Sequence, residues 1–316
     1  MRPDEHFHTP VLLKEVVEVL APCAGKTFVD GTLGGGGHAE ALLEAGAQVI
    51  GLDQDPEALE FTKEKRLHRF GSRFQPVRAN FAQLGAVLDA LGVAEIDGVL
   101  LDLGVSSWQL DTAERGFSFQ REGPLDMRMD PAGAVTAADL INAAPAEELV
   151  RIFKLYGEEP NARRVAARIV SGRMAKPFAT TMQLALAVED VVPRRSRIHP
   201  ATRIFQALRI AVNREMEVLE SVLGQAAVRL RVGGRMAVIT FHSLEDRMVK
   251  EFFKLRSVAE LDRPEWPAPR PNPDYIFRAL TRKPVIASAE EQQQNPRSRS
   301  AKLRAVEKIQ PREVKS

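Results

Sequence analysis

The sequence predicts a doubly wound α/β fold, Rossmann-like and built on a mostly parallel sheet, with an all-helical subdomain inserted into it. Short apolar runs alternate with helical stretches between residues 26 and 103, and a glycine-rich turn follows the first run. The alternation then stops and returns only at Gly234. Uninterrupted apolar strands separated by helices are typical of a parallel sheet that is covered on both faces.

Four strands and three helices are expected to alternate in the first part of the chain. In order they are strand 26–32, helix 38–45, strand 48–53, helix 56–68, strand 74–81, helix 83–91 and strand 96–103. Pro56 at the first turn of its helix supports that start, because the ring presets the backbone and a first-turn N–H has no helical partner to lose.

The middle of the chain carries no strong strand pattern. The expected helices are 146–156, 161–172, 181–191 and 202–223. We therefore assign residues 110–214 to an inserted helical subdomain that recognises the substrate, and residues 1–109 and 215–316 to one discontinuous cofactor-binding domain.

The α/β pattern returns in the last part of the chain, with a strand and a helix followed by two closing strands. They are strand 234–241, helix 244–255, and closing strands 275–287 and 302–309. The proline-rich stretch 263–274 is expected to be a loop, and the polar stretch 290–300 is expected to be mobile.

The composition indicates a globular, soluble, cytoplasmic protein. Apolar residues make up 44 % of the chain and charged residues 27 %, and no run approaches the length of a membrane span. The start of the chain lacks the apolar core of a secretory signal. Cys23 is the single cysteine, which excludes an intrachain disulfide and a cysteine zinc cluster and fits a reducing compartment.

The glycine loop is the strongest local motif. Gly34, Gly36 and Ala39 fit the spacing G-x-G-x-x-A between a strand and a helix, and Asp53 follows where an acid that binds ribose is expected. Glycines there let a ligand approach the backbone and expose the N–H groups of the helix start. This pattern alone leaves a nicotinamide cofactor and S-adenosylmethionine both open.

Asp30 favours S-adenosylmethionine. A carboxylate at the end of the first strand can accept hydrogen bonds from the ammonium group of that cofactor, whereas a pyrophosphate would be repelled. Asp53 can accept hydrogen bonds from both ribose hydroxyls. A hydrogen bond to a charged group contributes roughly 1.5–3 kcal/mol, so two such acids matter.

Several further motifs resemble those of the MraW family of ribosomal RNA small-subunit methyltransferases, and the resemblance spans nearly the whole chain. In order they are 8–13 (HTPVLL), 30–38 (DGTLGGGGH), 101–107 (LDLGVSS), 114–119 (ERGFSF), 123–129 (GPLDMRM), 199–203 (HPATR), 241–247 (FHSLEDR) and 295–297 (NPR). Together they are far more specific than a glycine loop.

The resemblance implies the fold of the class I methyltransferases and methylation of the exocyclic N4 of a cytidine in the decoding centre of 16S rRNA. The partner would be the small ribosomal subunit or a late assembly intermediate, and no metal is required. The implied cofactor contacts are Gly36, Gly37, His38, Asp53, Phe81, Asp102 and Gln109.

The residues themselves say less about catalysis. Phe81 closes the third predicted strand and would either stack on adenine or belong to the core. Asp102 ends the fourth strand, where it or a nearby carbonyl could hold the target amine. His242 and Ser243 follow the fifth strand; they either line the cytosine pocket or form a helix start with Ser243 as N-cap.

Basic residues gather in two segments. Residues 163–214 hold eleven Lys and Arg against two acids, a charge of +9, and residues 297–316 have a charge of +5. We expect a phosphate-binding face there, with Arg194, Arg195 and Arg197 as the best candidates for RNA contact.

Two other functions stay open at this point. A nicotinamide-dependent oxidoreductase could use the same fold, although Asp30 and the lack of a hydride-transfer constellation argue against it. A non-catalytic RNA-binding assembly factor could keep the pocket without turnover, and only a measured turnover separates it from the enzyme. A homodimer is also left open.

Overall fold

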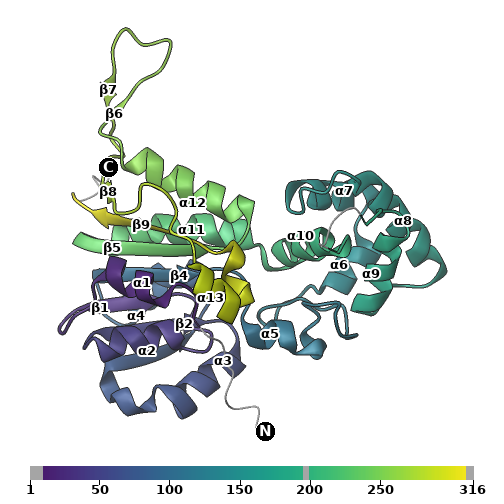
Figure 1. The fold of residues 1–316 in the computed structure, drawn as a ribbon, viewed down its shortest axis with the longest axis horizontal. Coiled ribbons are helices and arrows are strands. Elements are labelled where there is room, and N and C mark those ends of the chain that lie inside the picture. Colours follow the sequence, from purple (N-terminus) through teal and green to yellow (C-terminus); the bar gives the residue numbers. More distant parts are fainter. Residues whose placement is uncertain (1–9, 195–198, 311–316) are drawn as a thin grey trace. The chain divides into compact units, whose positions relative to one another are not determined.

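The computed structural model describes residues 10–194 and 199–310, which divide into two compact units. The first unit combines residues 1–104 with 218–316, and the second spans residues 105–217 (Figure 1). The range expected as an inserted subdomain, 110–214, lies within the second unit. Among the described residues, no helix has both the length and the apolar character that a membrane span requires.

The first unit contains a seven-stranded sheet in the order β3-β2-β1-β4-β5-β9-β8. The strands are β1 (Thr27–Asp30), β2 (Gln48–Asp53), β3 (Phe74–Arg78), β4 (Ile96–Asp102), β5 (Leu230–Thr240), β8 (Phe277–Ala279) and β9 (Lys302–Lys308). The strands β3, β2, β1, β4 and β5 are parallel, whereas β9 runs antiparallel to both of its neighbours. The predicted α/β class is therefore confirmed.

The strand order reverses between β1 and β4. The chain moves outward from β1 to β2 and β3 and then returns to β4 on the other side of β1. In open α/β sheets, ligands bind beyond the carboxyl ends of the strands at such a switch point. The residues that end β1, β2 and β4 there are Asp30, Asp53 and Asp102.

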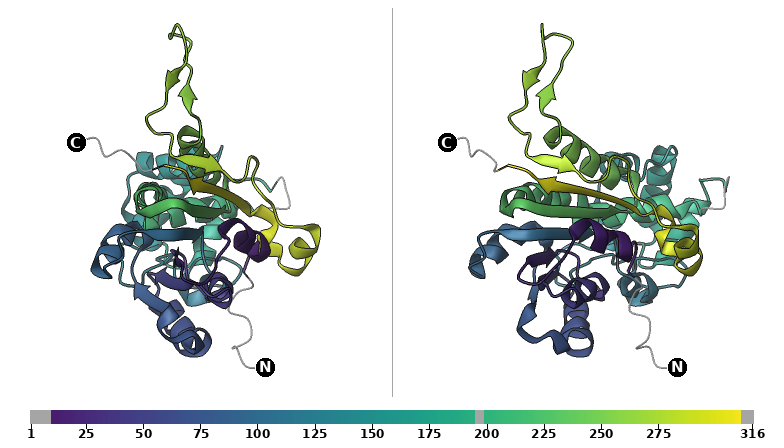
Figure 2. Two further views of the ribbon diagram at one scale, coloured as in Figure 1. Left: turned by 90° about the vertical axis from the view of Figure 1, so that its left-hand side faces the viewer. Right: turned by 60° about the vertical axis from the view of Figure 1, so that its left-hand side comes forward.

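Helices cover both faces of this sheet (Figures 1 and 2). Val99 and Leu101 of β4 face a core shared with α4 (Leu84–Ala90), α11 (Glu215–Arg229) and α12 (Ser243–Arg256). Leu100 between them faces a core shared with α1 (Leu13–Leu20) and α2 (Gly37–Glu44). Burial on alternate faces explains why β4 reads as a continuous apolar run.

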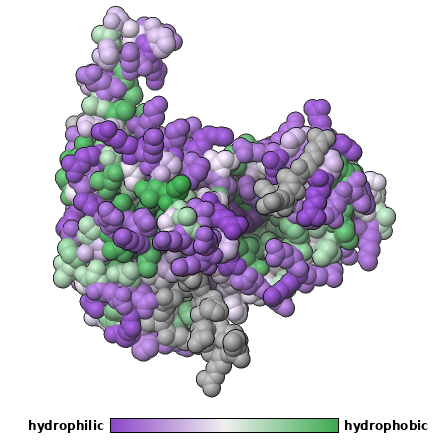
Figure 3. Space-filling model, viewed as in Figure 1, coloured by the Kyte–Doolittle hydropathy of each residue, from purple (hydrophilic) through white to green (hydrophobic). Residues whose placement is uncertain are grey.

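The second unit is helical and has its own apolar core. Its helices are α5 (Ser107–Asp111), η5 (Ala113–Arg115), α6 (Ala137–Ala143), α7 (Ala146–Leu155), α8 (Ala162–Ala175), α9 (Thr181–Glu189) and α10 (Ala201–Asn213). Hydrophilic side chains cover much of its visible face (Figure 3). The single helix expected over 202–223 was wrong, because Arg214 adopts a left-handed backbone (φ 51°) and separates α10 from α11.

The helix expected over 56–68 is shorter and irregular. An α-helical turn, α3 (Pro56–Glu60), passes into a π-helical turn, η2 (Phe61–Arg66), and then into a 3-10 segment, η3 (His68–Arg73). The side chains of Thr62 and Leu67 from this region pack against the glycine loop at Gly36. π-Helical turns occur often at functional sites, and this one shapes the loop that follows β1.

The polar stretch 290–300 is ordered, so the expectation that it is mobile was wrong. It forms α13 (Ala289–Gln294) and the 3-10 turn η6 (Pro296–Ser300), and Ser298 is fully buried. Glu291 accepts a hydrogen bond from the N–H of Leu12 at 2.8 Å, which places a helix near the end of the chain against the start of α1. Such a long-range contact leaves no local signal.

The proline-rich stretch 263–274 is mostly loop, as expected, and only Arg270–Pro271 within it forms a strand. Two short strands, β6 (Glu260–Leu261) and β7 (Arg270–Pro271), form a hairpin that projects from the first unit (Figures 1 and 2). The side chain of Asn272 stabilises the base of this hairpin, because its Nδ2 donates to the carbonyl groups of Leu255 and Val258 at 2.6 and 2.8 Å. The closing strand expected over 275–287 also shortens, to β8.

A glycine in β4 tests the packing of the sheet. A Cβ at Gly98 would lie 2.5 Å from the ring of Phe28, which is buried in the core. Gly98→Ala should lower the free energy of unfolding by about 1–3 kcal/mol, because overpacking a close-packed core forces strain. The matched control is Gly224→Ala in α11, where a Cβ meets nothing within 4 Å. This control should gain about 0.5–1 kcal/mol from helix propensity. Urea titration measures both, and equal midpoints for the two variants would contradict the packing.

Candidate active site at the carboxyl edge of the sheet

The glycine loop turns sharply between β1 and α2. Gly34 and Gly36 both have left-handed backbones, with φ of 48° and 75°, which glycine adopts without the steric cost of a side chain. A Cβ at Gly36 would also lie 2.9 Å from Cγ2 of Thr62. The loop is therefore a close backbone surface, and Gly36 serves as the N-cap of α2 without any side-chain cap.

Asp53, the last residue of β2, holds this loop in place. One carboxylate oxygen accepts the N–H of Gly34 at 2.8 Å, and the other accepts the N–H of Asp55 at 2.8 Å. Burial raises the pKa of Asp53 to about 6, and these backbone hydrogen bonds oppose that rise. The backbone N–H of Gln54 also donates to Asp53. A carboxylate has about four acceptor positions, so Asp53 can still accept from a ribose hydroxyl, as expected from the sequence.

Asp30, the last residue of β1, is almost fully buried. Its Oδ1 accepts the N–H of Thr32 at 3.2 Å. Burial raises the pKa of Asp30 to about 6; the nearby His38 opposes this rise, while the charges of Asp102 and Asp53 add to it. A buried carboxylate without a cationic partner costs free energy in its charged form, so a positively charged ligand group would be favoured here.

His38 and Asp102 face each other across the same edge. Nε2 of His38 lies 3.5 Å from Oδ2 of Asp102, and their side chains are 6 % and 11 % exposed. Neither ring nitrogen of His38, nor Oδ1 of Asp102, has a hydrogen-bond partner within residues 10–194 and 199–310. Buried polar atoms are nearly always hydrogen-bonded, so these atoms indicate a polar ligand or water at this place.

Thr32 links the ends of β1 and β4. Its Oγ1 accepts the backbone N–H of Asp102 at 2.6 Å, while its own N–H binds Asp30. Thr32 was given no role from the sequence, and no local pattern in the sequence indicates this bond. The threonine was therefore missed as a site residue.

Phe81 does not close the third strand, and that part of the prediction was wrong. The strand β3 ends at Arg78, and Phe81 begins the 3-10 turn η4 (Phe81–Gln83), which Asn80 caps. Phe81 is partly buried beside the core of the sheet, and its Cβ would lie 3.4 Å from a Cβ at Gly31. The ring is therefore next to the end of β1 without being part of the ladder.

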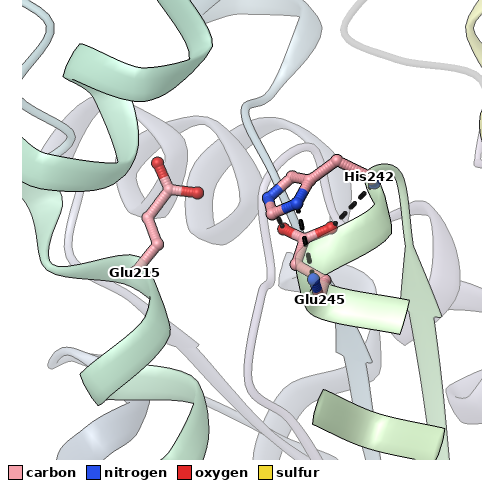
Figure 4. A group of neighbouring side chains, drawn as sticks. All are labelled: Glu215, His242 and Glu245. Atoms are coloured by element: carbon pink, nitrogen blue, oxygen red, sulfur yellow. Dashed lines mark hydrogen bonds and ion pairs between the residues drawn. The ribbon is translucent and has the colours of Figure 1, made fainter. Parts of the chain in front are cut away.

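His242, not Ser243, is the N-cap of α12, which corrects the expected cap. Nδ1 of His242 accepts the N–H of Glu245 at 3.4 Å, and Nε2 lies 3.0 Å from Oε1 of the same glutamate (Figure 4). Ser243 is the first helical residue and is exposed. Figure 4 also draws Glu215, which belongs to the second unit and pairs there with Arg209 at 2.8 Å.

Gln109 lies in α5 of the second unit, whereas the other predicted cofactor contacts belong to the first unit. Its side chain is buried and accepts the N–H of Ser106 at 3.1 Å, while Oγ of Ser106 accepts the N–H of Gln109 at 3.2 Å. This reciprocal pair is a capping box, so Gln109 has a structural task in its own unit.

Many of the basic residues counted in the sequence are paired within the protein. In the second unit, Arg168 pairs with Asp190 and Arg209 with Glu215, and Arg173 donates to two carbonyl groups. In the tail, Lys302 and Arg304 both bind Asp246.

The cations that are exposed and have no partner among the described residues are fewer. In the second unit they include Arg163, Arg164, Lys176 and Arg194. The other two predicted RNA contacts, Arg195 and Arg197, lie outside the described residues, as does the start of the motif at 8–13.

The carboxyl edge of the first unit thus combines a close glycine surface, three aspartates and an imidazole whose ring nitrogens make no hydrogen bond within the described part of the chain. Hydrogen-bond acceptors dominate this set. The arrangement suits a ligand with several donors, at least one of them cationic, and it can hold an N–H group against Asp102.

Comparison with known proteins gives close relatives over almost the whole chain. The model of the MraW methylase family matches residues 5–309. The chain is 51 % identical over 312 residues to the ribosomal RNA small subunit methyltransferase H of Trichlorobacter lovleyi, covering 97 % of this chain and 99 % of that one. The proteins of the same name from Anaeromyxobacter sp. (strain Fw109-5) and Geobacter sulfurreducens are 53 % and 52 % identical over 308 residues, and each alignment covers 96 % of this chain and 99 % of the relative.

The buried acid at the end of β1 predicts a pH-dependent stability. The pKa of Asp30 rises from 3.8 to about 6 on folding, so the folded chain binds this proton more tightly than the unfolded chain. Its contribution to the free energy of unfolding therefore decreases as pH rises from about 4 to about 6, and the penalty is complete above that range. Asp30→Asn should stabilise the chain at pH 7.5 by up to about 3 kcal/mol and have little effect at pH 4.

The control variant should change the free energy of unfolding in the opposite direction. Hydrogen bonds from Arg128 outweigh burial and lower the pKa of Asp126, so Asp126→Asn should destabilise the chain at pH 7.5. Urea denaturation across pH 4–8 measures both variants. A stability loss for Asp30→Asn at neutral pH would contradict the assignment of a buried, destabilised carboxylate.

Proposed function

The chain belongs to the MraW methylase family, and we propose that it transfers a methyl group from S-adenosylmethionine to the exocyclic N4 of a cytidine in the decoding region of 16S rRNA. The proposal is supported by the meeting of Asp30, Asp53 and Asp102 beside the glycine loop, in a chain whose relatives are named as ribosomal RNA small subunit methyltransferases. The nucleotide and its position come from the resemblance of the motifs.

The residues present fit the cofactor. Asp30 would accept from its ammonium group, Asp53 would accept from the ribose hydroxyls, and Phe81 would contact the adenine. The backbone of Gly34, Gly36, Gly37 and His38 forms the close surface, which a side chain at Gly36 would fill. The ring nitrogens of His38 and Oδ1 of Asp102, which make no hydrogen bond among the described residues, would find partners in the bound cofactor or in water. Gln109 is a cofactor contact that the resemblance alone implies.

S-Adenosylmethionine supplies an electrophilic methyl group with a good leaving group, so the protein mainly has to position the acceptor. The N4 amine of cytosine is conjugated with its ring and is a weak nucleophile. We assign to Oδ1 of Asp102 the task of accepting one N–H of this amine, so that the nitrogen lone pair is directed at the methyl group. The same carboxylate would take the proton that the amine loses as the new N–C bond forms and the bond between the methyl group and sulfur breaks, its electrons going to the sulfur. Oδ2 of Asp102 lies 3.5 Å from Nε2 of His38.

His242 and Ser243 follow β5 at the same edge and are proposed to line the cytosine pocket. The imidazole of His242 is engaged with Glu245, so we assign it no proton transfer. Ser243 is exposed in the first turn of α12 and can contact the base or its sugar.

The helical subdomain of residues 110–214 is proposed to bind the RNA through phosphates. Its exposed cations include Arg163 and Arg164 on α8 and Arg194 after α9, and the sequence adds Arg195 and Arg197. The substrate is proposed to be the small ribosomal subunit or a late assembly intermediate, because the subdomain offers many charges and few aromatic side chains for base stacking.

Product analysis tests the reaction. The purified protein is incubated with methyl-labelled S-adenosylmethionine and small subunits from cells that lack the enzyme, and the labelled nucleoside is identified after digestion. We expect N4-methylated cytidine at one site. Asp102→Asn keeps the backbone bond to Thr32 and should lower the rate about 10²- to 10⁴-fold, the range for a residue that accepts a proton. Label in another nucleoside, or an unchanged rate in the variant, would contradict the proposal.

Salt dependence tests the RNA surface. Arg163→Gln combined with Arg164→Gln should weaken binding of the small subunit and reduce the slope of log K against log salt by about 1–2, because each phosphate contact contributes roughly 0.7–0.9. The control combines Arg151→Gln with Arg278→Gln, which removes two exposed cations that are paired with Glu148 and Glu307. Equal slopes for the two double variants would show that α8 is not part of the RNA-binding surface.

A further inference from the structure

Thr32 lies at the junction between β1 and β4, and the proton of its hydroxyl group makes no hydrogen bond among the described residues. A hydroxyl group can accept two hydrogen bonds and donate one. Oγ1 of Thr32 accepts the N–H of Asp102 at 2.6 Å. Its proton has no acceptor within hydrogen-bond distance in the described part of the chain, residues 10–194 and 199–310. The hydroxyl is therefore a donor that is available to a ligand.

Most backbone donors of the neighbouring loop are already used inside the protein. The N–H of Leu33 binds the carbonyl of Leu52 at 2.9 Å, and that of Gly36 binds the carbonyl of Leu33 at 2.7 Å. The N–H of Gly34 binds Asp53. These bonds leave two side-chain donors near Asp30, the Thr32 hydroxyl and an N–H of the His38 ring. Of the two, only Thr32 is also hydrogen-bonded to Asp30, through its own N–H.

The position beside Asp30 decides what this donor can recognise. The amino-acid end of S-adenosylmethionine carries an ammonium and a carboxylate on the same carbon atom. If Asp30 accepts from the ammonium, the carboxylate comes next to a cluster of three aspartates and needs a donor to offset their repulsion. We propose that the Thr32 hydroxyl donates to this carboxylate, so that Asp30 and Thr32 together recognise the zwitterion.

The bond from Asp102 strengthens this role. A hydroxyl that accepts a hydrogen bond is polarised and becomes a better donor, and the same bond fixes its oxygen in place. Thr32 is thus a specificity residue for the cofactor and not only a link between strands. The inference rests on the cofactor of the proposed function and is independent of the RNA target.

The experiment is a double-mutant cycle between protein and ligand. Isothermal titration calorimetry compares S-adenosylhomocysteine with its decarboxylated analogue, which keeps the ammonium group. The proteins are wild type, Thr32→Val, which keeps the shape but lacks the hydroxyl, and Thr32→Ser, which restores it. Thr32→Ala serves as a second variant without a hydroxyl in case Thr32→Val does not fold.

The hydroxyl should matter only when the ligand carries its carboxylate. Thr32→Val should weaken the binding of S-adenosylhomocysteine about 10- to 100-fold, as expected for the loss of a hydrogen bond to a charged group. The decarboxylated analogue should bind both proteins within about threefold, and Thr32→Ser should resemble wild type. Equal loss for both ligands would show that Thr32 only holds the strand ends and would overturn the proposal, as would no loss for either. If wild type bound neither ligand, the proposed cofactor itself would fail.

Discussion

The site depends on the parallel pairing of β1 with β4. These strands lie side by side and run in the same direction, so Asp30 and Asp102 reach the same edge of the sheet. A single threonine links their ends, because the backbone N–H of Thr32 donates to the carboxylate of Asp30 and its Oγ1 accepts the backbone N–H of Asp102. The rest of the first unit supports this pairing: both faces are covered by helices, which hold the strands in one register.

Gathering acids at this edge has an energetic cost. Burial raises the pKa of both Asp30 and Asp53 to about 6, so these carboxylates are less stable as anions than they would be in water. Folding alone does not require buried carboxylates at the end of a sheet, because apolar or amide side chains would have a smaller free-energy cost of burial there. Their presence is explained by a ligand that brings donors and positive charge, and Asp53 has the additional task of holding the glycine loop through Gly34.

The sequence was sufficient where local pattern and chemistry coincide. Three local signals predicted the sheet and the place of the site: the apolar run before Asp102, the glycines before α2 and the acid at the end of β2. Each of these signals lies within a few residues of the feature that it predicts.

The predictions from the sequence failed where a residue far away in the chain determines the local structure. Glu291 binds Leu12 near the other end of the chain, so no local pattern could predict that residues 289–300 form ordered helical turns. Arg209 and Arg168 counted as free charge, although each is paired. His242 displaced Ser243 as N-cap because Glu245 is placed to bind it, and no propensity scale favours histidine there.

The most direct test of this account is a crystal structure of the chain with bound S-adenosylhomocysteine. We expect the ligand at the carboxyl edge of the sheet, with its ammonium group within hydrogen-bond distance of Asp30 and its ribose hydroxyls within the same distance of Asp53. A ligand bound elsewhere, or one with its adenine against Asp30, would contradict the assignment of the acids and with it the direction in which the methyl group is presented to Asp102.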